Sequence, residues 1–426
     1  MTKNNKNNKR LASGKNRGFA ALYVAIIVLA LMTGIALLLT FLTVNQQMIL
    51  GNYVKSYQSY SLAESGIEDA LLRLSKNMIW SSPYNLTLGN SSSIVEISDN
   101  IGGTRTITST GNVNNRIRKV QVVFTITNDK VSFNYGAQVG DGGMVIRNNS
   151  TIDGNVFSNG NVIGGGNHSE IAHSIIVAGS GNILEKIEVG EDATAHHCRL
   201  SHIGGTLTYV SGGEHTCTYD IAEKTRPNAV EKEPLPISAS KVQEWKLQAA
   251  NGGTIGSKIV SGNESLGPVK IEGNLTVNNG KTLTVDGTIY VTGNIIFSPN
   301  AIIKLASSYG PFSGMIIADG TITLENGVIL SGSGEPSSYM MVLSTNSSLD
   351  PLIPAIDVRN GVNGGIIYTT NGIIYLKNSM TAREITGYMI QVQENITIVY
   401  ESGLQDAIFT AGPGGSWKVA SWKEIE

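Results

Sequence analysis

The sequence predicts a mainly β protein: one long N-terminal α-helix crosses a membrane, and a small β region and a parallel β-helix follow it. Three observations predict this fold class. An uncharged apolar run extends from Phe19 to Val44, an amphipathic pattern continues it to about residue 76, and a glycine-rich repeat then occupies most of the chain. The 49 glycines, against 11 prolines, indicate many turns between short strands.

The apolar run is long enough to span a membrane. It contains no charge and no proline, and a bilayer core needs roughly 20 apolar residues in helical form. The leader, residues 1–18, is rich in lysine and arginine and has no acidic residue. Positive residues stay on the cytoplasmic side, so we expect a single-pass protein of the cytoplasmic membrane with its N-terminus inside. Its bulk would lie outside, at the cell surface.

The helical pattern does not stop at the end of the apolar run. Aromatic and aliphatic residues recur at a spacing of three and four, among them Tyr57, Tyr60, Ala63 and Ile67. We therefore expect one helix over residues 19–76, on the order of 80 Å long at 1.5 Å per residue. A helix of this length with an apolar first half suits a filament that buries N-terminal helices in a central bundle.

Two stretches resemble type IV pilins. Gly18 separates the basic leader from the apolar run, as Arg17-Gly18-Phe19, and the segment YSLAESGIEDAL that begins at Tyr60 is similar to a run in PilX-type minor pilins. The resemblance implies that a prepilin peptidase cuts after Gly18 and that Phe19 becomes the methylated N-terminus. It also implies other pilin subunits and the inner-membrane assembly machinery as partners. A plain signal anchor shares the leader and the apolar run, so an uncleaved anchor is the alternative.

One position departs from the major pilins. The resemblance implies a Glu at the fifth mature position, where it is thought to pair with the terminal amine of a neighbouring subunit, but this chain has Tyr23 there. A buried unpaired charge in an apolar bundle is costly, so a subunit without this Glu offers its neighbour no partner. The resemblance therefore implies a minor component. Alternatively, Tyr23 lies at the membrane interface of a protein that never enters a filament.

Composition, and the alternation of apolar and polar residues, limit what the part of the chain after the helix can be. The chain of 426 residues has room for two or more further domains. Its formal net charge is −2 and its pI about 6.3, so nucleic acid is not favoured as a partner. In residues 77–130, the segments SIVEISD, TRTITST and IRKVQVVFTIT alternate apolar and polar residues. This alternation predicts a small collar of three or four strands on the helix end.

A repeat begins near residue 131, in which an aliphatic residue follows a glycine at a distance of two. Paired copies begin at Gly154 and Gly160, at Gly287 and Gly293, and at Gly314 and Gly320. Units of about 22 to 27 residues, with Gly or Asn at the corners, predict a parallel β-helix whose units stack to bury an inward aliphatic row. Right-handed crossovers are the general expectation. The pattern loosely resembles bactofilin-like polymer-forming proteins, and a β-sandwich is the alternative.

The repeat is interrupted once. We expect a first β-helical block at residues 131–220, a connector with a short helix at 221–253, and a second block at 254–426. The connector begins with prolines and a run of charges, and Ser238 then provides an N-cap for good helix formers that end at two glycines. This helix is expected to cover an end or a side of the second block.

Both cysteines lie among the histidines, all six of which fall between His168 and His215. Two cysteines in an exported chain predict a disulfide between Cys198 and Cys217. Zinc is the alternative, because His196 with Cys198 and His215 with Cys217 would present two ligand pairs, each on one face of a strand. With the disulfide, the histidines would be surface or pH-responsive residues, and we expect no cofactor.

A β-helical glycan-active enzyme would need paired carboxylates at a fixed separation. The candidates are Asp153, Asp286 and Asp319, each directly before a glycine, and Asp-Gly is also ordinary turn chemistry. We therefore expect no enzymatic activity. Near the C-terminus, Trp417 and Trp422 are expected to plug the end of the solenoid, and an exposed aromatic platform for sugar binding is the alternative.

The sequence thus predicts a structural, membrane-anchored minor pilin-like subunit that carries a large β-helical head. The head would serve adhesion or assembly contacts, and a surface glycan or a molecule on a host or partner cell would be its ligand. The alternative is an uncleaved surface adhesin or envelope scaffold held in the membrane by the same helix. The mass of the N-terminal peptide separates the two, because only the pilin begins at Phe19.

Overall fold

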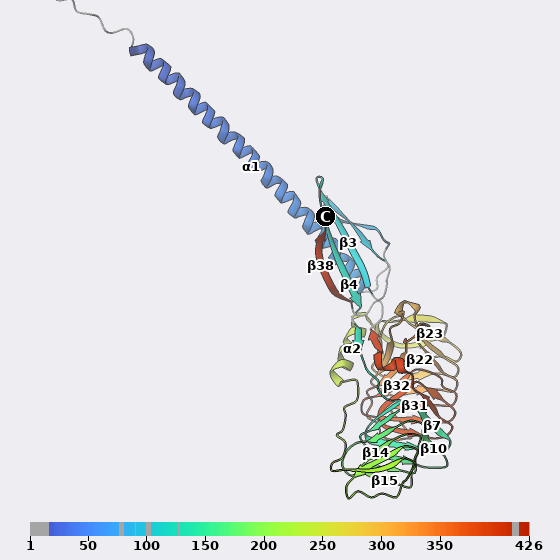
Figure 1. The fold of residues 1–426 in the computed structure, drawn as a ribbon. Helices are drawn as coiled ribbons and strands as arrows, with labels where there is room; N and C mark the ends of the chain where they lie inside the picture. Colours follow the sequence, from blue (N-terminus) through green and yellow to red (C-terminus); the bar gives the residue numbers. More distant parts are fainter. Residues whose placement is uncertain are drawn as a thin grey trace, which may run out of the picture.

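One long helix projects from an otherwise β molecule. The computed structural model describes residues 17–75, 81–89, 91–98, 104–126, 128–410 and 417–425. Helix α1 (Arg17–Ser75) is a single helix of 59 residues, and its first half extends away from every other element (Figure 1). The predicted continuation of the apolar run into the amphipathic segment is confirmed.

Five antiparallel strands form a collar on the second half of α1. Their spatial order is β1 (Tyr84–Leu88), β2 (Ser91–Ile97), β3 (Thr104–Val113), β4 (Arg116–Ile126) and β38 (Trp417–Ile425). The helix contributes Ala63, Ile67, Ala70 and Leu74 to the core between helix and sheet. The last strand comes from the C-terminus and pairs with β4. The assignment of all residues from 254 to 426 to the β-helix is therefore wrong at its end, because β4 offers β38 a free sheet edge.

The helix and the collar sheet approach each other closely at two glycines. A Cβ atom on Gly111 would lie 2.1 Å from the carbonyl oxygen of Ser59, and a Cβ on Gly66 would lie 2.3 Å from Oγ of Ser109. Side chains larger than hydrogen at these positions would push the helix off the sheet. Ser59 is buried there, and its Oγ accepts a hydrogen bond from the Val113 amide (3.2 Å), so the contact is specific in register as well as tight.

The rest of the molecule is a β-solenoid inserted between two neighbouring collar strands. Strand β5 (Asn128–Lys130) leads out of β4, and β37 (Ile408–Thr410) leads back toward β38. These two short strands pair with each other in antiparallel fashion, so the chain enters and leaves the solenoid at the same place. The collar is thus complete only after the chain has passed through the whole head.

The solenoid consists of two blocks of parallel strands. The first block contains β6 (Ala137–Ile146), β7 (Ser150–Asp153), β8 (Val156–Ser158), β9 (Val162–Gly164), β10 (Ser169–Ile171), β11 (Ile175–Val177), β12 (Ile183–Glu185), β13 (Glu188–Val189), β14 (Ala193–Ala195), β15 (His197–Arg199), β16 (His202–Ile203), β17 (Thr206–Val210), β18 (Thr218–Tyr219) and β19 (Ala222–Arg226). Strand β19 lies in the predicted connector, so the first block ends later than expected. The charged sequence of β19, AEKTR, did not predict a strand, because most of this strand is exposed to solvent.

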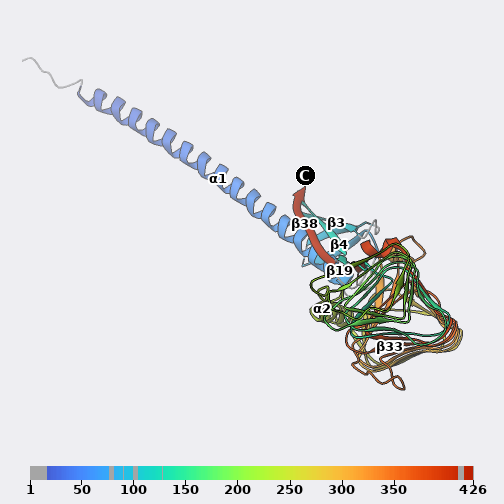
Figure 2. The ribbon, with the colours of Figure 1, turned by 60° about the horizontal axis from the view of Figure 1, so that its bottom comes forward.

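The second block is longer. It contains β20 (Thr254–Val260), β21 (Glu264–Leu266), β22 (Val269–Val277), β23 (Thr282–Val285), β24 (Ile289–Val291), β25 (Ile295–Phe297), β26 (Ile302–Leu305), β27 (Gly314–Ala318), β28 (Ile322–Leu324), β29 (Ile329–Ser331), β30 (Met340–Ser344), β31 (Ile356–Val358), β32 (Ile366–Thr369), β33 (Ile373–Leu376), β34 (Thr381–Ala382), β35 (Glu384–Val392) and β36 (Thr397–Val399). Two 3-10 helices, η1 (Ser307–Tyr309) and η2 (Ser402–Asp406), follow β26 and β36. Seen from the end of the solenoid, the coils superimpose (Figure 2).

The register of the coils explains the repeat in the sequence. Ile289 pairs with Ile316 and Ile316 with Val342, each in parallel, so these residues stack in the inward aliphatic row. Asparagines at the corners tie one coil to the next: Oδ1 of Asn274 accepts from the Asn294 amide (2.8 Å), and Oδ1 of Asn294 accepts from the Thr321 amide (2.9 Å). The parallel β-helix is confirmed and the β-sandwich alternative is wrong.

The two blocks stack in the reverse of their order in the chain. Strand β35, at the end of the second block, pairs in parallel with β6, at the start of the first, and Ile385 lies opposite Ala137. The second block therefore lies next to the collar, and the first block forms the far end of the molecule, where β14 and β15 lie (Figure 1). After β19 the chain runs back along the outside of the solenoid before it begins the second block.

Helix α2 (Ala239–Asn251) lies on this return path and covers a side of the second block. Oγ of Ser238 accepts a hydrogen bond from the Lys241 amide (3.3 Å), which confirms the predicted N-cap. Val242 and Trp245 of α2 pack on the outward side chains of β27, β30 and β32, such as Ile317. These strands are buried on both faces, so they read as continuous apolar runs in the sequence.

Candidate functional site

The first half of α1 is an apolar surface without a partner in the molecule. No charged residue occurs between Phe19 and Val54, and the side chains of Phe19, Leu37 and Phe41 are each more than 60% exposed. The hydroxyl of Thr40 donates to the Ala36 carbonyl (2.8 Å), and Thr33 and Thr43 likewise donate to carbonyls one turn earlier, so the threonine hydroxyls are satisfied within the helix. By length and composition, α1 is able to cross a membrane.

The predicted processing site lies at the start of this helix. Gly18 is helical, and Phe19 and Tyr23 follow on one face, one turn apart, with exposures of 67% and 63%. The preceding residues, 1–16, lie outside the described part of the chain. Cleavage after Gly18 and the assembly role of Tyr23 therefore stay predictions.

A disulfide joins Cys198 to Cys217 in the first block. The sulfur atoms are 2.08 Å apart, and both side chains are buried in the interior of the solenoid. Within the described residues, no cluster of His, Cys, Asp and Glu is arranged to hold a metal ion. The alternative zinc set of His196, Cys198, His215 and Cys217 would need the two thiolates that the disulfide consumes.

Next to the disulfide, a polar and aromatic layer closes the far end of the solenoid. Tyr209 pairs with the inward Ala195 and Glu223 with the inward Leu207, so both side chains point over the open end. The tyrosine hydroxyl donates to Glu223 Oε1 (2.6 Å), Tyr219 donates to Oε2 (3.0 Å), and the rings of Tyr209 and His215 stack with centroids 4.7 Å apart. The two tyrosine hydrogen bonds lower the pKa of Glu223.

The predicted plug of tryptophans is wrong, because both tryptophans lie on β38 in the collar. Trp417 pairs with Ile126 and Trp422 with Val122, and the ring of Trp422 is 40% exposed. The signal that locates the real end layer is the run of tyrosine, histidine and glutamate between residues 209 and 223. Its side chains are polar because this layer faces solvent on one side.

Three histidines of the first block lie next to carboxylates, two of them between a pair of carboxylates. His173 Nδ1 is 3.0 Å from Glu191 and its Nε2 is 3.3 Å from Asp153. His168 lies in the same way between Glu170 and Glu188, at 3.4 and 3.3 Å. The third is His202, which pairs with Asp220 (3.5 Å). All are about half exposed, and the hydrogen bond to Glu191 raises the pKa of His173.

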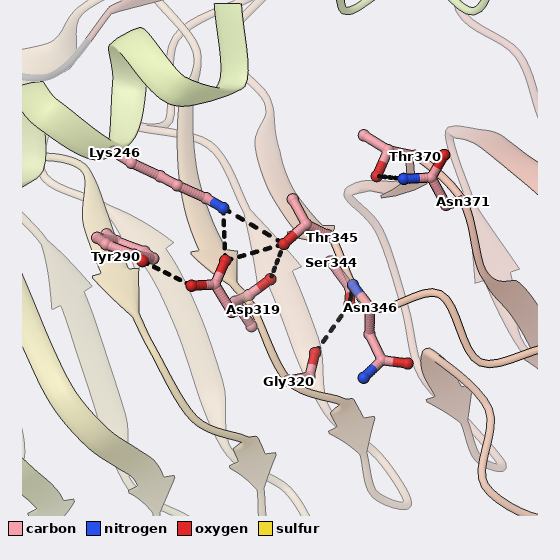
Figure 3. Close-up of polar contacts among 10 residues, drawn as sticks. Lys246, Tyr290, Asp319, Gly320, Ser344, Thr345, Asn346, Thr370 and Asn371 are labelled. Carbon is pink, nitrogen blue, oxygen red and sulfur yellow. Dashed lines mark hydrogen bonds and ion pairs between the residues drawn. The ribbon is translucent and has the colours of Figure 1, made fainter. Parts of the chain in front are cut away.

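The three candidate catalytic aspartates have unrelated surroundings. Asp153 pairs with a histidine of the first block, Asp286 is half-buried and interacts with Ser265, and Asp319 lies beneath α2. Lys246, Tyr290 and Thr345 all donate to the Asp319 carboxylate (Figure 3).

This arrangement gives Asp319 a structural role. Burial acts to raise the pKa of Asp319, but the three hydrogen bonds, led by that of Lys246, outweigh it and lower the pKa. The carboxylate therefore remains charged and ties Lys246, and with it α2, to the solenoid. Asp153, Asp286 and Asp319 do not form a pair in which one acid and one base face a shared substrate.

Sequence reasoning missed one buried carboxylate at the joint of the two blocks. Glu384, on β35, is 1% exposed and pairs with Ile366, an outward residue beneath the covering segments. Thr386 donates to one carboxylate oxygen, while Oε2 has no hydrogen-bond partner within the described residues. Burial raises the pKa of Glu384 well above its usual value. Nothing in the sequence distinguishes this glutamate from the exposed ones, because its burial depends on segments distant in the chain.

No protein-family model and no curated protein matches the chain. Among solved structures, the chain is similar to the competence-associated pilin ComZ from Thermus thermophilus, at 11% sequence identity. The match covers 87% of this chain and 97% of that chain, with a TM-score of 0.21. A TM-score of this size does not establish a shared fold, so the function proposed for the chain has to rest on its own helix, collar and head.

Proposed function

We propose that this chain is a minor pilin-like subunit of a type IV pilus or a related filament, anchored by α1 and presenting the solenoid as its head. One observation carries the proposal: a single helix has an exposed apolar first half and a second half packed on a small antiparallel sheet. A membrane anchor explains the first feature. It does not explain why the same helix continues, unbroken, into the core of the collar.

The length of the uncharged segment supports a bundle in addition to a membrane. From Phe19 to Val54 the helix measures about 50 Å at 1.5 Å per residue. The hydrocarbon core of a bilayer is about 30 Å thick. The surplus, which includes Tyr53 at 71% and Leu50 at 62% exposure, would lie outside the lipid without cover. Neighbouring pilin helices would cover it.

Tyr23 supports the proposal of a minor component. At the fifth position after Gly18 it provides no carboxylate for the terminal amine of a neighbouring subunit. A subunit of this kind would enter the filament at a low ratio or at its tip, with other pilin subunits and the inner-membrane machinery as partners. The head would then extend its first block farthest from the bundle, where it would serve adhesion or assembly contacts.

The mass of the N-terminal peptide tests the proposal. We expect a peptide that begins at Phe19 in sheared surface filaments, and the unprocessed leader only in membranes. Gly18→Val should block processing and remove the protein from filaments. Gly34→Ala is the matched control, because a Cβ on Gly34 meets no atom within 4 Å.

The second candidate is an uncleaved surface adhesin or envelope scaffold, which the exposed apolar first half of α1 also supports. An intact leader in every fraction, together with unchanged surface display of Gly18→Val, would replace the pilin proposal with this one.

A further inference from the structure

A rigid apolar loop stands out from the second block between β30 and β31. This segment, residues 346–355, is called the apolar finger below. Leu352 is 89% exposed, the highest value among the large apolar side chains described in the molecule, and Ile353 (63%) and Leu349 (46%) accompany it. A group of exposed apolar side chains on a folded protein commonly marks an interaction site.

Hydrogen bonds within the finger hold these side chains in place. The Ser348 amide donates to Asn346 Oδ1 (2.8 Å), the Leu352 amide donates to Asp350 Oδ1 (2.9 Å), and Ser348 Oγ donates to the Ile353 carbonyl. The amide of Ile373, on the next coil, donates to the Ser348 carbonyl (2.9 Å) and fixes the base. A loop ordered before binding loses little conformational entropy when its apolar side chains are buried.

An apolar groove opens beside the finger. The groove has a volume of about 350 Å³, and α2, the returning connector and the outer face of β32 line it with Leu235, Ile237, Val242 and Tyr368. An apolar cavity of about 150 Å³ holds a benzene molecule, so this groove has room for two side chains of the size of leucine.

The finger and the groove meet at one edge of the solenoid. Thr345 lines the groove and is followed directly by Asn346 of the finger, and Thr370 and Asn371 line the same rim. Figure 3 shows these residues at the ends of neighbouring strands. The finger does not enter its own groove, since Leu352 remains almost fully exposed.

We propose that two copies of this chain pair through this edge, with the finger of each copy inserted in the groove of the other. A two-fold axis requires the same surface to present both a knob and its socket, and this edge does so. The finger presents Leu352 and Ile353, and the groove has room for two side chains of about that size, so the finger of one copy matches the groove of the other in size and apolar character. The pairing joins heads and does not depend on the pilin proposal.

Cysteine cross-linking of the full-length protein in membranes tests the pairing. Leu352→Cys and Leu235→Cys are carried on separately tagged copies and expressed together. We expect a disulfide-linked pair that contains both tags under mild oxidation. The matched control replaces Leu352→Cys by Ile221→Cys, which is 72% exposed but lies at the far end of the first block. Cross-linking no stronger than this control would overturn the proposal, as would a link from Leu352→Cys to a different protein only.

A concentration series with the detergent-solubilised full chain provides a second test. We expect a dimer whose dissociation constant rises about 30-fold or more with Leu352→Asp, the loss typical of an anchor residue at an interface. Leu200→Asp, at a position that is 66% exposed and remote from the groove, should leave the constant unchanged. Leu352 makes almost no contact within its own chain, so folding is not at risk. A wild-type protein that stays monomeric at tens of micromolar would overturn the pairing.

Discussion

The two blocks of the solenoid share one architecture and differ in what stabilises them. A coil of the second block directs large side chains inward, such as Ile295, Phe297 and Ile303, and α2 covers part of its outer surface. A late coil of the first block directs Ala193 and Ala195 inward and adds the disulfide and the layer of tyrosines, histidine and glutamate.

A solenoid coil needs little interior volume if other bonds replace the lost burial. Apolar burial contributes roughly 25 cal/mol per Å², so alanine coils gain much less than isoleucine coils. The thin coils lie at the far end, where no further coil stacks on them, and there the chain uses a covalent bond and charged hydrogen bonds.

The largest effect is expected in the interior of the second block. Phe297→Ala should lower the free energy of unfolding by about 3–5 kcal/mol, since it leaves a cavity in a fully buried site. Its neighbour Ile296 points outward and is 42% exposed, so Ile296→Ala should cost under about 1 kcal/mol. Denaturant unfolding measures both. Equal losses would mean that the interior of this block is not what stabilises it.

Removing the disulfide should affect the first block alone. The bond spans 19 positions, and the loss of a loop closure of this size costs about 3 kcal/mol. We expect Cys198→Ala with Cys217→Ala to reduce hydrogen-exchange protection in β15, β17 and β18 by that amount, while β24 to β28 keep theirs. A uniform loss over both blocks would contradict the view that they are stabilised separately.

The buried Glu384 should make the joint between the blocks sensitive to pH. Its pKa in the folded protein is raised, so its contribution is fully present below the unfolded value of about 4.3 and is lost as the pH rises toward the folded value. Stability should fall by up to about 1.4 kcal/mol per pH unit in that window. Unfolding measured from pH 4 to 8 should show this slope in the wild type and not in Glu384→Gln. The exposed Glu335→Gln serves as the control, and an unchanged slope in Glu384→Gln would reject this role.

The smallest effect concerns His173, and it should be confined to the first block. The pKa of His173 is raised, chiefly by Glu191, so its stabilisation is present below about pH 6.5 and is lost as the pH rises through the higher folded value. Both partners are about half exposed, so the contribution should stay under about 1 kcal/mol.

NMR titration of the imidazole rings tests the cause of the raised His173 pKa. We expect Glu191→Gln to lower the pKa of His173 and to leave that of His197 unchanged. Burial lowers the pKa of His197, which provides an internal comparison within the same block. A His173 pKa that does not respond to Glu191→Gln would show that the hydrogen bond is not the cause.

Local patterns predicted much of the fold correctly. The apolar run at Phe19 and the spacing of Tyr60 and Ile67 predicted one long helix, and the glycine repeat predicted stacked parallel coils. Ser238 predicted the start of α2. Each of these features depends on residues within a few positions of one another, or on a spacing repeated along the chain. The candidate sites were predicted less completely, because Cys198 and Cys217 are distinctive in the sequence whereas Glu223 and Glu384 are not.

Helical and strand periods are properties of neighbouring residues, so the sequence alone is enough to predict the type of each element and the face that it buries. The order of the parts in space depends on pairings between segments that are distant in the chain. Pairing of β35 with β6 placed the second block before the first in space, and pairing of β38 with β4 returned the C-terminus to the collar. Parallel strands of similar composition can pair in many orders, and backbone hydrogen bonds are alike in all of them, so they do not favour one order over another. The order in which the strands pair depends on the whole solenoid and not on any single segment.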